Sequence, residues 1–510
     1  MIFKKILSPV ALVCAAVMML ASCSKSVSVN DKAKEYLPDD CVLMMSGDIE
    51  RVLNALECKT NSDGQIELSD DLAALARGAY GIDEFLDFKG VNWDNVVVGS
   101  RLKGGNETAM ILFSVLDKDA FCKSAQDSDE NIEVEEEDGY TIVGGKRAAI
   151  AIKDNVGIIV VKDSGRPAKR NKMVSTIEDW RAEAKENTMA DWKIDYLAES
   201  RVFNMLINCK KISNMYPGAD AGLYAMNPVI KDIMKGYIGL SFDVDGLQAV
   251  AKGEAFDAEG KPLKLEAYGA FDSSLLAYAS PKDVFAAGMG VGSTKDSAQS
   301  LSIIPYMSEQ MIAQIQQVYD MFDNSSVMFA AGPTGGLQSI VDPQVENWHM
   351  VLAAKMAPGK AEEAMNLLRT MNPDSTIAAN PNEMTFRIVT GYKETEPEYG
   401  EYDDIYGGFE EVYATVYVKR EGDVVIVSNA PIAKQSNSFK AGEFEGKAVE
   451  AQLTLSKADL KRITGMELPF GVNAAVDVAK DSNGGSFAIA LTETTGTIVG
   501  NVLEVTGGLK

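Results

Sequence analysis

Residues 240–256 read Leu-Ser-Phe-Asp-Val-Asp-Gly-Leu-Gln-Ala-Val-Ala-Lys-Gly-Glu-Ala-Phe. Apolar and polar residues alternate around the Asp245-Gly246 pair, which is typical of two antiparallel strands joined by a tight turn. A similar stretch runs from Val472 to Val505 around Asn483-Gly484-Gly485. Helical segments fall between such hairpins rather than after every strand. This arrangement predicts an α+β fold built on antiparallel sheet.

An internal repeat is indicated by three pairs of segments that occur in the same order. Leu37-Pro38-Asp39-Asp40-Cys41-Val42 aligns with Ser280-Pro281-Lys282-Asp283-Val284-Phe285. Met110-Ile111-Leu112 aligns with Met350-Val351-Leu352, and the strand 148–153 aligns with 414–419. Ordered matches of this kind favour duplication over chance. We therefore expect two tandem related α+β halves, 37–273 and 274–510, each with hairpins or a meander and packed amphipathic helices.

The amino-terminal residues predict export and lipid attachment. Lys4 and Lys5 precede an apolar stretch, and Leu20-Ala21-Ser22-Cys23 follows it. This pattern is typical of a signal peptide, here residues 1–22, that is cut before a cysteine. Lipid on Cys23 would then hold the protein at a membrane. Residues 23–36 begin with a small, polar composition that predicts a flexible tether.

The overall charge excludes one class of partner. The formal net charge is −25, so the chain repels phosphate backbones and anionic lipid surfaces. Nucleic acid is therefore not expected as a partner.

Four cysteines follow Cys23, namely Cys41, Cys58, Cys122 and Cys209. An exported protein can form disulfides, and four cysteines allow three pairings, none of which the sequence selects. Because no Cys-x-x-Cys pair is present, we interpret them as buried thiols or one structural bridge rather than a metal site.

No catalytic motif emerges from the sequence. The single histidine, His349, has no marked partner and is interpreted as a strand-end residue. The segment 288–295 departs from both phosphate-loop patterns, and Asp243-Val244-Asp245-Gly246 departs from a calcium loop. We predict no catalytic residue, cofactor or metal site. A pair of carboxylates for glycan hydrolysis stays open because the chain has 74 acidic residues, but no pair is singled out.

The most unusual segment is 390–411, where tyrosines alternate with acidic residues at a point where the second half is longer than the first. A solvated acidic loop is the simplest interpretation. Alternatively, its carboxylates could hold calcium, or its tyrosines could stack on a sugar or contact a partner. The candidate contact residues are Tyr392, Tyr399, Tyr402, Asp403, Asp404 and Tyr406.

The leader ending at Cys23, the opening Leu37-Pro38-Asp39-Asp40, the duplicated halves and the hairpin-rich ends together resemble the large outer-membrane lipoproteins of Bacteroidetes that carry an uncharacterised domain. The resemblance implies an outer-membrane, lipid-anchored protein without an assigned activity, and Cys23 is the only site it transfers. Surface lipoproteins of that group tend to carry acidic residues after the lipidated cysteine, whereas Ser24-Lys25-Ser26 follow here. The periplasmic and surface faces both stay open.

These features together predict a non-catalytic binding or scaffold protein of the cell envelope, with the membrane as a partner through its lipid and an envelope protein or glycan as a further one. A carboxylate-dependent glycan hydrolase is the alternative from a different class. An adhesion or complex-forming lipoprotein that uses 390–411 as its contact is the third hypothesis. The sequence leaves the oligomeric state open.

Overall fold

The computed structural model describes residues 29–48, 51, 59–60, 66–67, 89–103, 106–128, 131–145, 149–162, 166–167, 170–215, 232–264, 268–293, 316–334, 347–373, 376–377, 380–394 and 409–507. The predicted signal peptide, Cys23 and Cys58 lie outside these ranges. Among the described residues, no helix is long and apolar enough to cross a membrane.

The chain forms two compact units. Unit 1 comprises residues 1–220, 232–263 and 495–510, and unit 2 comprises 221–231 and 264–494. The chain passes from unit 1 to unit 2 after residue 263, ten residues before the boundary expected at 273. Its carboxyl-terminal residues belong to unit 1. The strands expected over 472–505 form a hairpin, Gly471–Ala479 and Gly484–Thr492, but Ile498–Gly507 forms a helix, α17. Its first amide donates to Gly246 O at 3.0 Å, so α17 starts beside the turn of the 240–256 hairpin.

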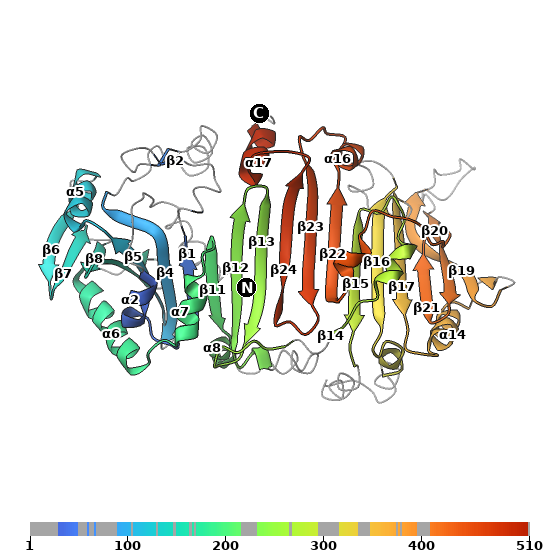
Figure 1. Cartoon of the computed structure of the whole chain (residues 1–510), viewed down its shortest axis with the longest axis horizontal. Helices are drawn as coiled ribbons and strands as arrows, with labels where there is room; N and C mark the ends of the chain where they lie inside the picture. The colour runs from blue at the N-terminus through green and yellow to red at the C-terminus, as the bar shows by residue number, and fades with distance from the viewer. Residues whose placement is uncertain are drawn as a thin grey trace, which may run out of the picture. The chain divides into compact units, whose positions relative to one another are not determined.

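The sheet of unit 1 is antiparallel, with strand order β6-β7-β8-β9-β5-β4-β1-β11-β12-β13 and the short β10 beside β9 (Figure 1). Its strands are β1 Leu43–Gly47, β4 Val91–Lys103, β5 Asn106–Val115, β6 Glu133–Glu137, β7 Tyr140–Gly144, β8 Ala149–Lys153, β9 Val156–Lys162, β10 Arg166–Pro167, β11 Phe203–Asn208, β12 Tyr237–Asp245 and β13 Gln248–Phe256. A separate pair joins β2 Lys59–Thr60 to β3 Ile66–Glu67. The first strand, β1, therefore lies inside the sheet and not at an edge.

The hairpin expected around Asp245-Gly246 is confirmed as β12 and β13. Asp245 pairs with Gln248, so Gly246 and Leu247 form the two-residue turn, one position later than expected. Gly246 has φ +55°, a left-handed conformation that glycine adopts without strain. The β8–β9 hairpin closes similarly, with Asp154 and Asn155 at φ +49° and +65°, as a type I′ turn requires.

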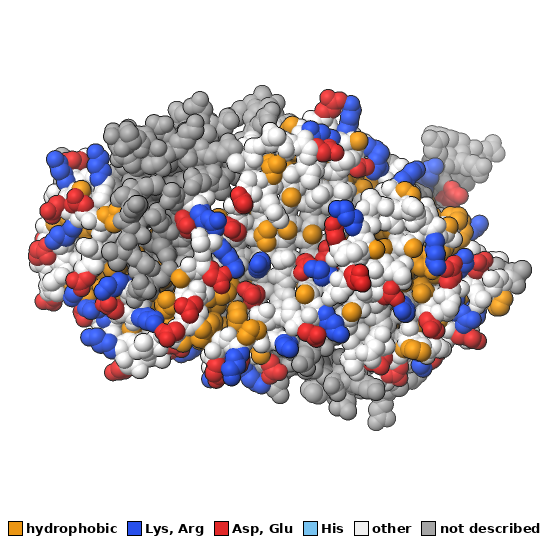
Figure 2. Space-filling view, in the orientation of Figure 1, with side chains coloured by type: hydrophobic (Ala, Val, Ile, Leu, Met, Phe, Trp, Pro, Cys, Tyr) orange, Lys and Arg blue, Asp and Glu red, His pale blue; other side chains and the backbone are white. Residues whose placement is uncertain are grey.

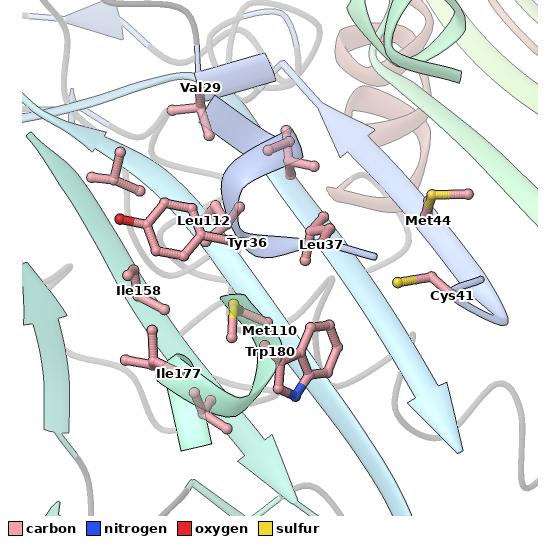
Figure 3. Close-up of a cluster of buried hydrophobic side chains, with 14 of the residues drawn as sticks. Val29, Tyr36, Leu37, Cys41, Met44, Met110, Leu112, Ile158, Ile177 and Trp180 are labelled. Carbon is pink, nitrogen blue, oxygen red and sulfur yellow. The ribbon is translucent and has the colours of Figure 1, made fainter. Parts of the chain in front are cut away.

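The described helices of unit 1 are α2 Val29–Tyr36, α5 Lys118–Ser128, α6 Met173–Glu186, α7 Asp191–Ala198 and α8 Cys209–Met215, besides α17 and the short η1 Arg170–Lys172. Side chains of α2 and α6 meet those of β4, β5 and β9 in a buried apolar cluster. Figure 3 shows Tyr36 and Leu37 beside Met110, Leu112 and Trp180 in this cluster. On the opposite face, Phe121 and Ala125 of α5 pack against a second cluster with Phe113 and Val143.

The expected tether is wrong from residue 29 onward. Val29, Ala33 and Tyr36 follow one another at i, i+4 and i+7, and all three are buried. This spacing puts them on one face of α2, while Lys32, Lys34 and Glu35 cover the other. The polar composition therefore belongs to the solvent face of a short amphipathic helix that closes the core.

The described strands of unit 2 also pair antiparallel, in the order β18-β19-β20-β21-β17-β16-β15-β22-β23-β24, with the short β14 beside β15. Its strands are β14 Tyr268–Gly269, β15 Phe285–Val291, β16 Ser326–Pro333, β17 Trp348–Lys355, β18 Thr376–Ile377, β19 Glu383–Glu394, β20 Phe409–Glu421, β21 Val424–Ser428, β22 Lys447–Leu455, β23 Gly471–Ala479 and β24 Gly484–Thr492. Its helices are η2 Ser273–Tyr278, α14 Ala361–Met371, α15 Ala441–Phe444 and α16 Lys457–Thr464.

Helices cover parts of both faces of this second sheet. Leu275 and Leu276 of η2 and Phe444 of α15 pack with Met328 and Ile426 on one face. On the other face, Ala364 and Met365 of α14 pack with Met384, Val418 and Val425. The α+β class and the antiparallel sheet are thus confirmed.

Tyr36→Ala tests whether α2 is part of the core. Loss of this buried ring should lower the free energy of unfolding by about 3 kcal/mol, as measured by urea denaturation. Glu35→Ala on the solvent face is the matched control and should change the stability by less than about 0.5 kcal/mol. Equal stability of both variants and the wild type would restore the flexible-tether interpretation.

Candidate functional site

His349 lies at the start of β17 and binds a buried carboxylate. Its Nδ1 is 2.6 Å from Oδ1 of Asp283, whose side chain is fully buried in the turn before β15. The other carboxylate oxygen accepts the amide of Ser280 at 2.7 Å. The pair therefore joins this turn to β17. Sequence analysis singled out the histidine but missed Asp283, which is remote in sequence although it belongs to a quoted repeat segment.

A buried lysine makes a comparable connection in unit 1. Lys193 of α7 donates to Oδ1 and to the carbonyl of Asp39, at 2.8 and 2.9 Å, and to the hydroxyl of Tyr237 at 2.7 Å. These contacts satisfy all three ammonium hydrogens. Burial lowers the pKa of Lys193, and Asp39 partly opposes that effect. The lysine thus ties α7 to the turn before β1 and to β12. Nothing in the sequence marks it apart from other helical lysines.

Unit 2 holds a buried glutamate that brings two carboxylates together. Glu450 of β22 is 4 % exposed, and its Oε2 has no hydrogen-bond partner. The amide nitrogen of Gln452 donates to Glu450 Oε1 at 3.0 Å and to Glu443 Oε2 at 2.8 Å, so these oxygens lie less than about 6 Å apart. Burial raises the pKa of Glu450.

Carboxylate oxygens at this separation resemble the spacing of a retaining glycosidase, whose carboxyl groups are about 5 Å apart. Such an enzyme needs both carboxyl groups to face bound sugar. Glu450 instead lies against Gly288 in the adjacent strand β15, with almost no surface to offer. The geometry therefore fits a structural carboxyl group rather than a nucleophile or general acid.

Each unit has a small cavity over its sheet. The cavity of unit 1 is about 230 Å³ and is lined by Arg201 and the β12–β13 hairpin, with Asp243, Asp245 and Lys252 among its charges. The cavity of unit 2 is about 270 Å³ and lies over β19 and β20 beside Pro431 and Ile432. Both are smaller than the roughly 300 to 1,000 Å³ usual for small-molecule sites.

Both described ends of the segment predicted as an acidic loop are strand. Residues 390–394 and 409–411 extend β19 and β20, whose pairing reaches Glu394 opposite Phe409. Tyr392 lies on β19 with 66 % of its surface exposed. Tyr399, Tyr402, Asp403, Asp404 and Tyr406 lie outside the described residues.

Cys41, Cys122 and Cys209 are free thiols. Burial raises the pKa of Cys41 to about 12 and that of Cys209 to about 11, and it also raises the pKa of Cys122. Thiolates are the reactive form, so a raised pKa lowers the reactivity of these side chains near neutral pH. The interpretation as buried thiols holds for Cys41 and Cys209, whereas Cys122 is only partly buried, and Cys58 lies outside the described ranges.

Within the part of the chain that the structure describes, no cluster of three or more histidine, cysteine or acidic side chains could hold a metal ion.

Glu450→Gln tests the cost of the buried carboxyl group. The folded state binds the proton of Glu450 more tightly than the unfolded state does, because the folded-state pKa is raised. This proton therefore stabilises the fold fully below the ordinary pKa of 4.5, and the stabilisation is lost as pH rises through the raised pKa. The variant should therefore gain stability over the wild type as pH rises from about 4 to 8, in urea unfolding. Glu445→Gln, at an exposed position, should follow the wild type. A constant difference across this range would contradict the assignment.

Comparisons with known proteins leave the family unassigned. No family model and no curated protein matches the chain, so the resemblance to Bacteroidetes lipoproteins stays a prediction. Among solved structures, crystal form III of TP0453 is similar at 9 % identity and a TM-score of 0.25, over 45 % of this chain and 81 % of that one. Crystal form IV of TP0453 is similar at 10 % identity and a TM-score of 0.24, over 44 % of this chain and 83 % of that one. Crystal form I of TP0453 is similar at 9 % identity and a TM-score of 0.22, over 43 % of this chain and 75 % of that one.

Proposed function

We propose that this chain is a non-catalytic binding or scaffold protein of the cell envelope, held at a membrane by lipid on Cys23. The observation that carries the non-catalytic part is the use of its buried polar groups. Lys193 ties a helix to the turn before β1 and to β12, and Asp283 ties a turn to β17 through His349. These groups, which could act as acid or base, are thus engaged in joining elements, as structural networks commonly are.

The proposal includes two tandem copies of one fold. Without the short β10 and β14, each unit has ten described strands in this sheet arrangement, numbered here along the chain. In both units the first strand lies between the second and the eighth, and the third lies between the second and the seventh. The pairs that correspond are β1 and β15, β4 and β16, β5 and β17, β6 and β18, β7 and β19, β8 and β20, β9 and β21, β11 and β22, β12 and β23, and β13 and β24.

Hydrogen bonds outside the ladders agree with this correspondence. The amide of Val42 donates to Ser100 O at 2.8 Å in unit 1, and the amide of Val284 donates to Ala331 O at 3.0 Å in unit 2. The carbonyl of Val42 accepts Asn208 N, and that of Val284 accepts Thr454 N. In each unit, these bonds link the residue before the first strand, β1 or β15, to the two strands beside that strand. This agreement supports duplication independently of the sequence alignment.

A duplicated sheet offers broad surfaces more readily than a deep pocket. On the face drawn in Figure 2, basic and acidic side chains are interspersed with small apolar groups, although the chain is acidic overall. Mixed charge suits selective contact with a protein or glycan better than attraction to one strongly charged polymer.

A second candidate function is complex formation through the extended β19–β20 hairpin. These strands have 12 and 13 residues, whereas the corresponding β7 and β8 have five each. Val389, Tyr392 and Tyr413 are exposed on the extension. Exposed aromatic side chains on a projecting element are common at protein contacts.

Cys23→Ala tests the membrane tether. The variant should appear in the soluble fraction of lysed cells and lose label from radioactive fatty acid, because a lipid-modified cysteine supplies the anchor. Ser24→Ala, one residue later, should remain in the membrane fraction. Membrane retention and labelling of Cys23→Ala would contradict the tether. Saturable turnover of an envelope glycan by the purified mature chain would contradict the non-catalytic role.

A further inference from the structure

One face of the unit 2 sheet is apolar over six adjacent strands. In β24-β23-β22-β15-β16-β17, alternate residues share a face. On one face lie the first residue and every second residue after it in 487–489, 474–478, 449–453, 285–289, 327–331 and 350–354. None of these residues carries a charged side chain. The opposite face of the same strands carries Glu450, Gln452 and Asp477, or is covered by η2 and α15.

Large side chains on this face are exposed although they lie inside a sheet. The exposed fractions are 39 % for Met289, 37 % for Phe329, 41 % for Leu352, 37 % for Val476 and 47 % for Phe487. The ladder register puts four of them in one row, in which Phe487 is opposite Val476 and Phe329 is opposite Leu352, with Ala451 and Ala287 between the two pairs. The exposed residues therefore form one continuous surface.

Little of the described chain covers this surface. Helix α14 packs on the same face, but its contacts lie with Ala354, Val425, Val418 and Met384, toward the β18 end of the sheet. Met45, Val98 and Ile111 of unit 1 hold the ladder positions that correspond to Ala287, Phe329 and Leu352. All three residues of unit 1 are buried. That comparison rests on the proposed duplication. Among the described residues, this face is thus buried at these places in unit 1, whereas Phe329 and Leu352 are exposed at the corresponding places in unit 2.

The open face is large enough to associate with another protein. Six strands spaced about 4.8 Å apart and five residues of each at about 3.4 Å per residue span roughly 24 by 14 Å, or on the order of 500 Å² with the side-chain margins. Monomeric proteins rarely expose contiguous apolar patches larger than a few hundred Å². A sheet with an apolar face is normally stabilised by packing it on another layer.

We propose that this face binds the same face of a second copy of the chain, so that two sheets pack against each other in a symmetric dimer. A partner must be flat, apolar and free of charge where it touches the face, and a second copy meets all three conditions. Two such faces would bury about 1,000 Å², the lower limit for a specific interface. Sheets packed in this way lie about 10 Å apart.

The charge of the chain sets the strength of this dimer. Each copy carries a net charge of −25, and none of the described strand positions that form the apolar face carries a charged side chain. Two copies therefore repel through their remaining surfaces while their apolar faces attract. Salt screens the repulsion but does not weaken apolar contact, so the dimer should tighten as salt rises.

Sedimentation velocity on the otherwise full mature chain with Cys23→Ala tests the proposal without lipid. Between about 1 and 100 μM the chain should pass from monomer to dimer, with more dimer in about 500 mM than in 50 mM sodium chloride. In the same background, Leu352→Glu buries a charge at the contact and should raise the dimer dissociation constant about tenfold or more. Phe487→Glu, at the most open position of the row, should act alike and guards against a folding defect in the first variant.

Met466→Glu is the matched control, because Met466 is exposed in the loop after α16 and not on the face. It should dimerise like the parent chain. A parent chain that stays monomeric at both salt concentrations would overturn the proposal, as would face variants that dimerise normally. Flotation of a monomeric parent chain with phosphatidylcholine vesicles, abolished by Leu352→Glu, would identify a lipid contact instead. Membrane release by Cys23→Ala does not depend on any of these outcomes, so the two proposals fail separately.

Discussion

Each unit depends on a short central strand that pairs on both sides with strands distant in sequence. Leu43 of β1 pairs with both Ser100 and Ile207, and Phe285 of β15 pairs with both Ala331 and Leu453. Such pairing closes long loops and is costly in chain entropy. The sheet then extends outward from the centre in both directions. The burial of the helix-covered core and the position of the hairpins at the sheet ends follow from this arrangement.

The segment that enters each central strand is fixed by a buried ionisable group. Lys193 holds Asp39 in unit 1, and His349 holds Asp283 in unit 2. Burying a charge is expensive unless it is paired and hydrogen-bonded, and both groups have such partners. Different chemistry thus fixes the segment before the central strand in each unit. A residue that would suggest catalysis in isolation, the single histidine, is explained by this connection.

Local patterns predicted the fold better than they predicted long-range contacts. Alternation around Asp245-Gly246 predicted a hairpin because adjacent strands and their turn need no distant information. Helix α2 was missed because five of its eight residues carry polar or charged side chains, and only Val29, Ala33 and Tyr36 form its buried stripe. The Asp283–His349 and Lys193–Asp39 contacts could not be predicted, since their partners meet only after the sheet has formed. For the candidate contact residues, only Tyr392 could be compared with the structure.

Hydrogen exchange followed by mass spectrometry on the mature chain tests the central-strand arrangement most directly. Exchange of core amides requires opening of the surrounding sheet, whereas edge strands open locally. Amides of β1 should therefore exchange much more slowly than those of β6, and amides of β15 more slowly than those of β18 and the outer part of β19. The two central strands should behave alike. Exchange of β15 at the rate of β18, with β1 protected, would contradict the view that both units are organised around their first strand.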